Sequence, residues 1–153
     1  MNYSYKKLSS EDLPLMHELL AMFGEVFGEP DTYQGAVPDD AYLKTLLGKP
    51  HFIALAALDA GGAVAGGLAA YELEKFERAR SEIYIYDLAV REDHRRRGVA
   101  TGLIRTLQGI AGERGAYVIY VQADPGDEPA IRLYTSLGTR EDVHHFDIPV
   151  RRG

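Results

Sequence analysis

The sequence contains no cysteine. Such a chain forms no disulfide, holds no cysteine-ligated zinc or iron–sulfur cluster, and offers no thiol nucleophile. It also lacks an uninterrupted apolar run of the length that a membrane span needs, and its first residues lack the apolar region of a signal peptide. We therefore expect a cytoplasmic protein with no membrane partner.

An excess of positive charge is also missing. The 153 residues include 17 Lys and Arg against 23 Asp and Glu, which gives a net charge of −6. Binding to a nucleic-acid backbone requires the opposite balance, so we expect no nucleic-acid partner. With 46% hydrophobic and 26% charged residues the composition is that of an ordinary globular protein. The length fits one domain spanning residues 1–153.

The charges are unevenly distributed along the chain. The segment from Leu8 to Leu43 has no Lys or Arg and carries a charge of −8, whereas four arginines lie within the seven residues 91–97. These runs can be two solvated faces. They can also mark a bipolar molecule, with one site for a cation and another for an anion.

Hydrophobic periodicity predicts one α/β domain. A cap at Ser9–Asp12 followed by apolar residues at helical spacing up to Phe27 indicates a helix, and a loop is expected over 28–38. Further helices are expected over 39–47, 98–114 and 129–137, and strands over 2–7, 51–58, 63–73, 82–90, 117–122 and 143–148. The tyrosines at 84, 86, 117 and 120 are expected to pack within the sheet.

The junction between strand 82–90 and helix 98–114 has the features of a phosphate site. A helix begins with unpaired backbone N–H groups, small residues let a phosphate approach them, and the arginines add positive charge. Neither a Walker loop nor a dinucleotide-binding glycine motif is present.

Three features at this junction and beyond carry a family resemblance. The spacing Arg95-x-x-Gly98-x-Ala100 directly follows a strand ending Leu88-Ala89-Val90, and Ala130-x-x-Leu133-Tyr134-x-x-Leu137-Gly138 lies downstream. Together with the element order they resemble the GNAT superfamily of N-acetyltransferases. Longer strings are similar to the type I aminoglycoside 3-N-acetyltransferases, namely SEIYIYDLAV at 81–90, GAYVIYVQAD at 115–124, HFDI at 145–148, FIALAA at 52–57 and Phe23-Gly24.

The resemblance implies a fold, a reaction and a co-substrate. The fold would be a mixed central sheet of six to seven strands, splayed between the fourth and fifth strands and flanked by about four helices. The reaction would be direct transfer of acetyl from acetyl-CoA to the 3-amino group of the 2-deoxystreptamine ring of gentamicin-type aminoglycosides, which confers resistance. The residues that would bind acetyl-CoA are Leu88, Ala89, Val90, Arg95, Arg96, Arg97, Gly98, Val99, Ala100 and Thr101.

Two residues are candidates for proton transfer. By the resemblance, Tyr134 would be the general acid that protonates the departing thiolate; the alternative is a core tyrosine. Asp87 is the candidate base, because a carboxylate within an apolar strand usually has a partner or a function. The alternative is a structural aspartate that accepts backbone hydrogen bonds. Glu82 is the second candidate for the base.

Carboxylates are also expected to grip the ammonium groups of a cationic substrate. The candidates are Asp31, Glu82, Asp124, Asp127 and Asp142. A polyamine, a protein N-terminus or a lysine would suit the same acidic walls, and a non-catalytic CoA-binding module is a third reading. The five scattered histidines show no metal-ligand spacing, so no metal is expected. Because only about fifteen residues follow Gly138, we expect one last strand and a homodimer that covers the exposed sheet edge.

Overall fold

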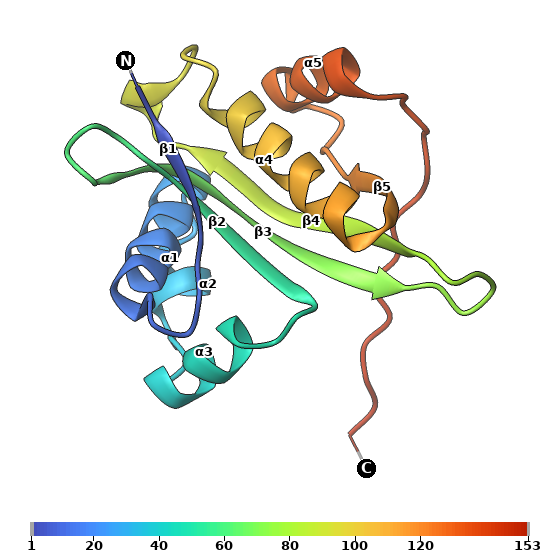
Figure 1. The fold of residues 1–153 in the computed structure, drawn as a ribbon, viewed down its shortest axis with the longest axis horizontal. Coiled ribbons are helices and arrows are strands. Elements are labelled where there is room, and N and C mark those ends of the chain that lie inside the picture. The colour runs from blue at the N-terminus through green and yellow to red at the C-terminus, as the bar shows by residue number, and fades with distance from the viewer. Residues whose placement is uncertain (1, 153) are drawn as a thin grey trace. The chain divides into compact units, whose positions relative to one another are not determined.

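The computed structural model describes residues 2–152. They form two compact units that divide between Gln122 and Ala123, and each unit is described by itself. The first unit holds every strand and four of the five α-helices of the described residues (Figure 1). The second unit holds the remaining helix and the C-terminal segment.

The first unit is built on a five-stranded mixed sheet in the order β1-β2-β3-β4-β5. The strands are β1 (Ser4–Lys7), β2 (Phe52–Leu58), β3 (Val64–Glu74), β4 (Ser81–Val90) and β5 (Ala116–Val121). Neighbours from β1 to β4 are antiparallel, and β5 runs parallel to β4. Six of the seven β2 residues are buried, as expected for a strand whose sheet is covered on both faces. These five strands confirm the corresponding sequence predictions to within two residues at each end.

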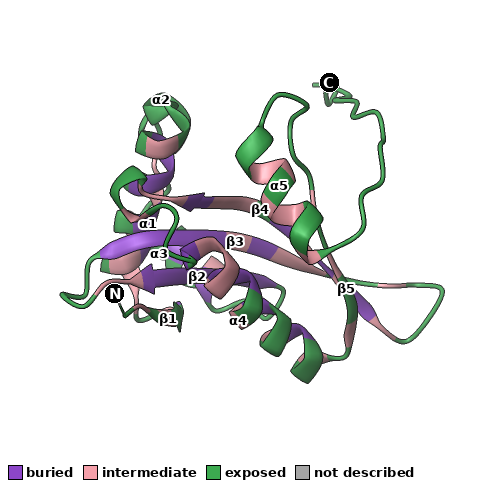
Figure 2. Ribbon diagram, turned by 90° about the horizontal axis from the view of Figure 1, so that it is seen from above, coloured by how far each residue is buried: buried purple, intermediate pink, exposed green. Residues whose placement is uncertain are grey.

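Helices cover both faces of this sheet. They are α1 (Leu13–Phe27), α2 (Pro30–Gln34), α3 (Asp40–Leu47) and α4 (Val99–Arg114). Figure 2 shows α1 and α2 on one side of β3 and β4, with α4 on the other. Two adjacent glycines of β3 show that a helix packs on each face of the sheet, because successive side chains along a strand point to opposite faces. A Cβ at Gly67 would collide with Leu19 of α1, and one at Gly66 would lie 3.2 Å from Val99 of α4.

The core lies between the helices and the sheet. Met16, Leu19 and Phe23 of α1 are buried against residues of β2 and β3, and Leu103 and Leu107 of α4 are fully buried. These buried residues lie on the apolar face of each helix or next to it. The helical spacing of apolar residues in the sequence thus reflects a helix face that packs on the sheet, as predicted. The buried face of α4 holds this helix on the sheet, with only the loop 91–98 between its first turn and the end of β4.

Helix α2 replaces part of the loop predicted over 28–38. Pro30 stands in its first turn, where the fixed φ of proline favours a helix start and no N–H is needed. The helix is only five residues long and buries none of them completely, so it has no apolar periodicity from which it could be predicted. Residues 2–152 therefore contain five α-helices where about four were expected.

The predicted sheet of six to seven strands is wrong, because the described residues form five. The second unit contains α5 (Glu128–Leu137), and residues 138–152 after it form neither strand nor helix. The strand expected over 143–148 is therefore absent. A strand needs a partner for its backbone N–H and C=O groups, and no described residue of the second unit is in a strand. Val143, Phe146, Ile148 and Val150 are all more than 70% exposed.

Strand β4 loses its β5 partner halfway along. The parallel pairing runs from Ser81 opposite Ala116 to Ile85 opposite Val121 and stops there, whereas β4 continues to Val90. On its other side β4 has a bulge, since Ala70 pairs with Ile85 and Ala69 pairs with Asp87, which leaves Tyr86 as the extra residue. The separation lies between the fourth and fifth strands, where the family resemblance predicts a splay.

Candidate active site

The candidate site begins at the unpaired edge of β4. The Arg91 N–H donates to Ala65 O of β3 at 2.8 Å. Because backbone groups alternate in direction along an antiparallel strand, those of Leu88 and Val90 point away from β3. The Arg95 Nε donates to Val90 O from that side at 3.3 Å. The N–H groups of Leu88 and Val90 are thus directed toward the gap that β5 leaves.

A positively charged loop connects this edge to α4. Arg91 begins it and is itself engaged, donating from Nε to Val64 O and from Nη1 to Glu25 Oε2, each at 2.8 Å. A turn of 3-10 helix follows over Glu92–His94. Arg95 and Arg96 are exposed, and Arg96 has φ +62°, a conformation that a non-glycine residue seldom adopts.

The start of α4 offers backbone donors to an anion. Its N-cap is Gly98, with φ +79° and no side-chain cap. The first bond of the helix runs from Gly102 N to Gly98 O at 2.9 Å. The N–H groups of Val99, Ala100 and Thr101 precede it and have no acceptor within the helix. Together with the helix dipole and the arginines they form a site suited to phosphate.

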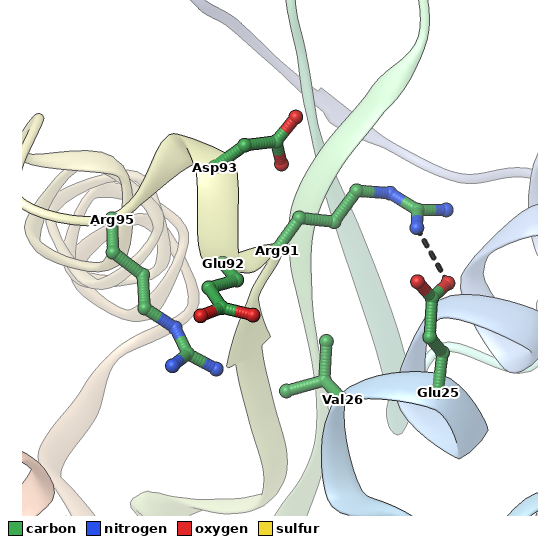
Figure 3. Close-up of a pocket in the computed structure, with 6 residues that line it drawn as sticks. All are labelled: Glu25, Val26, Arg91, Glu92, Asp93 and Arg95. Atoms are coloured by element: carbon green, nitrogen blue, oxygen red, sulfur yellow. Dashed lines mark hydrogen bonds and ion pairs between the residues drawn. The ribbon is translucent and has the colours of Figure 1, made fainter.

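Figure 3 shows the recess beside this loop, where Arg91 and Arg95 extend on either side of Glu92. It is open to solvent and encloses about 490 Å³. Its lining comes from the C-terminal part of α1 and from the loop, namely Glu25, Val26, Arg91, Glu92, Asp93 and Arg95. The Arg91–Glu25 ion pair joins the two walls, so the arginine loop is tied to the helical layer that carries the acidic segment.

Asp87 lies half-buried on β4, between the bulge at Tyr86 and the outward-pointing Leu88. Its Oδ2 accepts a hydrogen bond from the Tyr33 hydroxyl at 3.0 Å. Burial raises the pKa of Asp87 above its usual value, and the nearby charge of Glu29 raises it further, whereas the Tyr33 bond lowers it. A carboxylate whose pKa is raised is a better proton acceptor near neutral pH than an exposed one.

Tyr33 is the residue of this site that sequence reasoning missed. It comes from α2, and its ring packs at 5.9 Å and 5.8 Å from the rings of Phe23 and Phe27. Burial and the adjacent Asp87 raise its pKa, so it remains a hydrogen-bond donor. The one available signal was Pro30, a helix-starting residue three positions before Tyr33 within a segment interpreted as loop.

A row of tyrosines crosses the sheet next to Asp87. Tyr120 stacks on Tyr84 at 4.8 Å between centroids, Tyr84 lies 6.0 Å from Tyr86, and Tyr86 lies 6.1 Å from Tyr71. Tyr86 is 63% exposed, and Tyr117 and Tyr120 are also exposed. Tyr84, Tyr86 and Tyr120 thus pack against one another across the sheet, as expected, while Tyr86, Tyr117 and Tyr120 also remain partly open to solvent. The β4 bulge places Tyr86 opposite no residue of β3 and so contributes to its exposure.

The two candidate substrate carboxylates of the first unit have different surroundings. Asp31 is exposed in the first turn of α2. Glu82 is half-buried and lies 3.5 Å from the Lys75 ammonium, and it accepts a hydrogen bond from Tyr117 at 3.1 Å. A cationic substrate at Glu82 would compete with the lysine that is already there.

The second unit carries Asp124, Asp127, Tyr134 and Asp142. Asp124 is exposed, Asp127 caps α5 by accepting from the Ala130 N–H at 3.3 Å, and Asp142 is exposed and pairs with Arg140 at 2.7 Å. Tyr134 is half-buried on α5. Burial raises the pKa of Tyr134 to about 12, and the charge of Asp127 contributes.

Residues 14–139 match the acetyltransferase (GNAT) family, so this chain belongs to that family of acetyltransferases. Within it, the protein is similar over 99% of its length to an aminoglycoside acetyltransferase from an uncultured soil metagenomic sample, with 57% identity, a TM-score of 0.96 and coverage of 100% of that chain. A second aminoglycoside acetyltransferase from such a sample, in complex with sisomicin, is 30% identical with a TM-score of 0.90 and 97% coverage of each chain.

Curated relatives are more distant. N-acetyltransferase family 8 member 2 of Rattus norvegicus is 27% identical over 88 residues, which cover 58% of this chain and 39% of the relative. The chain thus spans about two fifths of the length of that relative. The family membership confirms the GNAT resemblance found in the sequence.

GNAT acetyltransferases use acetyl-CoA, and the residues present fit it. The outward N–H groups of β4 can pair with an extended chain of amides, while the unpaired donors at the start of α4 and the arginines suit its phosphates. Within the described residues, no group of three or more His, Asp or Glu side chains could hold a metal ion. No helix over residues 2–152 has the length and apolar character to cross a membrane.

Gly98→Ala is expected to raise the KM for acetyl-CoA by about tenfold. A Cβ at φ +79° is strained by ~1–2 kcal/mol, and relief of that strain would move the α4 donors. Gly115, with φ +76°, ends the same helix, and a Cβ at either position would meet nothing within 4 Å. Gly115→Ala should therefore cost similar stability without changing this KM. Steady-state kinetics and urea unfolding of both variants test this, and an equal KM in both would contradict it.

Proposed function

We propose that this protein transfers acetyl from acetyl-CoA to the 3-amino group of the 2-deoxystreptamine ring of gentamicin-type aminoglycosides in the cytoplasm, and so confers resistance. The observation that carries the proposal is the 57% identity to an aminoglycoside acetyltransferase over 99% of this chain. The strings shared with type I aminoglycoside 3-N-acetyltransferases support the choice of the 3-amino group.

In the proposed reaction the amine must lose a proton before it attacks. Asp87 accepts that proton, since its raised pKa makes it a stronger base than an exposed carboxylate and its position adjoins the unpaired β4 edge. The outward Leu88 N–H would stabilise charge that develops on the acyl oxygen, a contribution of ~3–4 kcal/mol where such donors have been removed. Acetyl-CoA supplies the activated acyl group when it is bound.

The second proton transfer is assigned to Tyr134. As the new N–C bond forms and the C–S bond breaks, its hydroxyl gives a proton to the departing thiolate. The nitrogen loses its second proton as the amide forms, and that proton restores the phenol. With a pKa of about 12 the phenol is protonated throughout the neutral range. Because the chain has no cysteine, no acetyl-cysteine can form, and the acetyl group is proposed to pass directly to the amine within a complex that holds both substrates.

Carboxylates are proposed to hold the other ammonium groups of the antibiotic. Asp31 in the first unit and Asp124 in the second are exposed and so accessible to a cation. At Glu82, Asp127 and Asp142 the substrate would compete with a present partner, namely Lys75, the N-terminus of α5 and Arg140. The exposed face of Tyr86 would add a surface on which a cationic sugar ring can lie.

The proposal is tested by measuring CoA release with a panel of amines at equal concentration. Gentamicin and sisomicin are expected to give turnover, with kcat/KM at least a hundredfold above that for spermidine or for a peptide with a free N-terminus and a lysine. Turnover of the polyamine or peptide without turnover of any aminoglycoside would overturn the substrate assignment. No release of CoA with any amine would favour a non-catalytic CoA-binding module.

The same proposal includes a homodimer. The C-terminal segment 138–152 exposes four large apolar side chains at Val143, Phe146, Ile148 and Val150, which are 72%, 80%, 86% and 88% accessible. Such a row usually lies against a partner surface in solution. Light scattering at micromolar concentration should give twice the mass of 16.9 kDa. A monomer at that concentration would contradict this part of the proposal.

A further inference from the structure

We propose that Tyr33 is a positioning residue for the acetyl transfer: its hydroxyl holds the Asp87 carboxylate in place and keeps it ionised as the proton acceptor. The inference rests on the proposed function in taking Asp87 as the base. It extends that function to helix α2, which no motif in the sequence connects with strand β4.

Tyr33 contacts Asp87 directly and leaves one oxygen of the carboxylate free to accept a proton. The Tyr33 hydroxyl donates to Oδ2 of Asp87 at 3.0 Å. Among residues 2–152 this is the one hydrogen bond to the Asp87 side chain. A carboxylate accepts on both oxygens, so the second oxygen is the one that can take a proton from an ammonium group. The tyrosine thereby fixes the rotation of the carboxylate about the Cβ–Cγ bond.

The local structure holds Tyr33 firmly at this position. Phe23 and Phe27 of α1 pack against its ring, and Gly24 between them has no side chain. A Cβ at Gly24 would lie 3.2 Å from the Cβ of Tyr33, so any larger residue would push α2 away. The Glu29 N–H also donates to Gly24 O at 2.9 Å. Helix α2 is thus fixed to α1 at the point that sets the Tyr33–Asp87 distance.

The groups around Asp87 make this hydrogen bond important for its charge. Glu29 precedes α2, and Tyr71 of β3 and Tyr84 of β4 are close enough to interact with the carboxylate. Burial and Glu29 raise the pKa of Asp87, and Tyr33 lowers it. Since the pKa of Tyr33 is itself raised, this donor keeps its proton over the whole neutral range. Without it, the carboxylate would be protonated at a higher pH.

The test is Tyr33→Phe, which keeps the ring and removes the hydroxyl. Tyr42→Phe is the matched control, because Tyr42 is 60% exposed on α3 and makes no side-chain hydrogen bond among the described residues. The protein is labelled with ¹³C at the aspartate carboxyls, and the Asp87 signal is assigned by its loss in Asp87→Asn. Its titration then reports the pKa without any need for turnover.

We expect Tyr33→Phe to make Asp87 a roughly tenfold weaker acid, since a hydrogen bond to a charged group is usually worth about that factor. Tyr42→Phe should leave the titration unchanged. An Asp87 titration that is unmoved or shifted to lower pH in Tyr33→Phe would overturn the inference. This measurement needs no substrate, so it can support the role of Tyr33 even if no aminoglycoside is acetylated. Failure of this inference can therefore be told apart from failure of the proposed function.

Kinetics provide the second readout. The active form carries an ionised Asp87, so a higher pKa moves the acid limb of the kcat/KM profile to higher pH. We expect Tyr33→Phe to lose up to about tenfold in kcat/KM on the acid limb of the profile and less at pH 9. A merely structural role for Tyr33 would lower the rate by one factor at every pH. That uniform loss, with the NMR titration shifted, would show that Asp87 is not the base and would overturn the positioning role.

Discussion

Asp87→Asn is expected to lower kcat for aminoglycoside acetylation by about 10²–10⁴-fold, the usual contribution of a positioned general base. Asparagine has nearly the same shape and can still accept the Tyr33 hydrogen bond, so the geometry of β4 should persist. It cannot take a proton from an ammonium group. The loss should therefore fall on kcat, with little change in the KM for acetyl-CoA.

The matched control for this variant is Asp59→Asn. Asp59 lies in the turn between β2 and β3 and accepts from the N–H groups of Gly61 and Ala63 at 2.9 Å and 3.0 Å. It is a carboxylate with a purely local hydrogen-bonding role, and its removal should affect stability more than rate. If Asp87→Asn retains more than half of the wild-type kcat while remaining folded, Asp87 is a structural aspartate.

Tyr134→Phe should give the second largest loss, about 10²-fold in kcat. The phenylalanine preserves the half-buried ring on α5 and removes the one proton that the thiolate is proposed to take. Since the pKa of Tyr134 is about 12, no alkaline limb below pH 10 should come from this group. Steady-state rates from pH 6 to pH 10, with Tyr42→Phe for comparison, measure both points. Unchanged kcat would reassign Tyr134 to packing.

The elements that carry the candidate cofactor-binding residues could be predicted from sequence because they obey strong local rules. Strand β4 is rich in β-branched and aromatic residues, and α4 has apolar residues at helical spacing between two glycines of positive φ. The arginine loop between them follows from these two boundaries. The position of Gly98 immediately before the unpaired N–H groups of α4 therefore follows from the local sequence.

The errors in the prediction have two physical causes. Residues 143–148 include β-branched and aromatic residues, as a strand does, but a strand forms only where its backbone groups find a partner strand, and that is a property of the whole fold. Helix α2 is too short for periodicity to reveal it. The Tyr33–Asp87 hydrogen bond could not be predicted from the sequence either, because the two residues are 54 positions apart and no local pattern relates them.

The acidic segment also needed the structure for its interpretation. Part of its charge is used within the protein. Asp12 pairs with Lys6 at 2.9 Å, Asp39 caps α3 through the Tyr42 N–H at 2.8 Å, and Asp40 lies 2.9 Å from His17. Glu25 holds Arg91. The segment from Leu8 to Leu43 therefore has fewer carboxylates free to bind a cationic substrate than its charge of −8 suggests.

The most direct test of the proposed function is the position of the acetyl group on the product. Gentamicin is incubated with the protein and acetyl-CoA to completion, and two-dimensional NMR locates the new amide. The proposal predicts one acetyl group, on the 3-amino nitrogen of the deoxystreptamine ring, formed together with one equivalent of free CoA. An acetyl group on any other amine, or no amide at all, would contradict it.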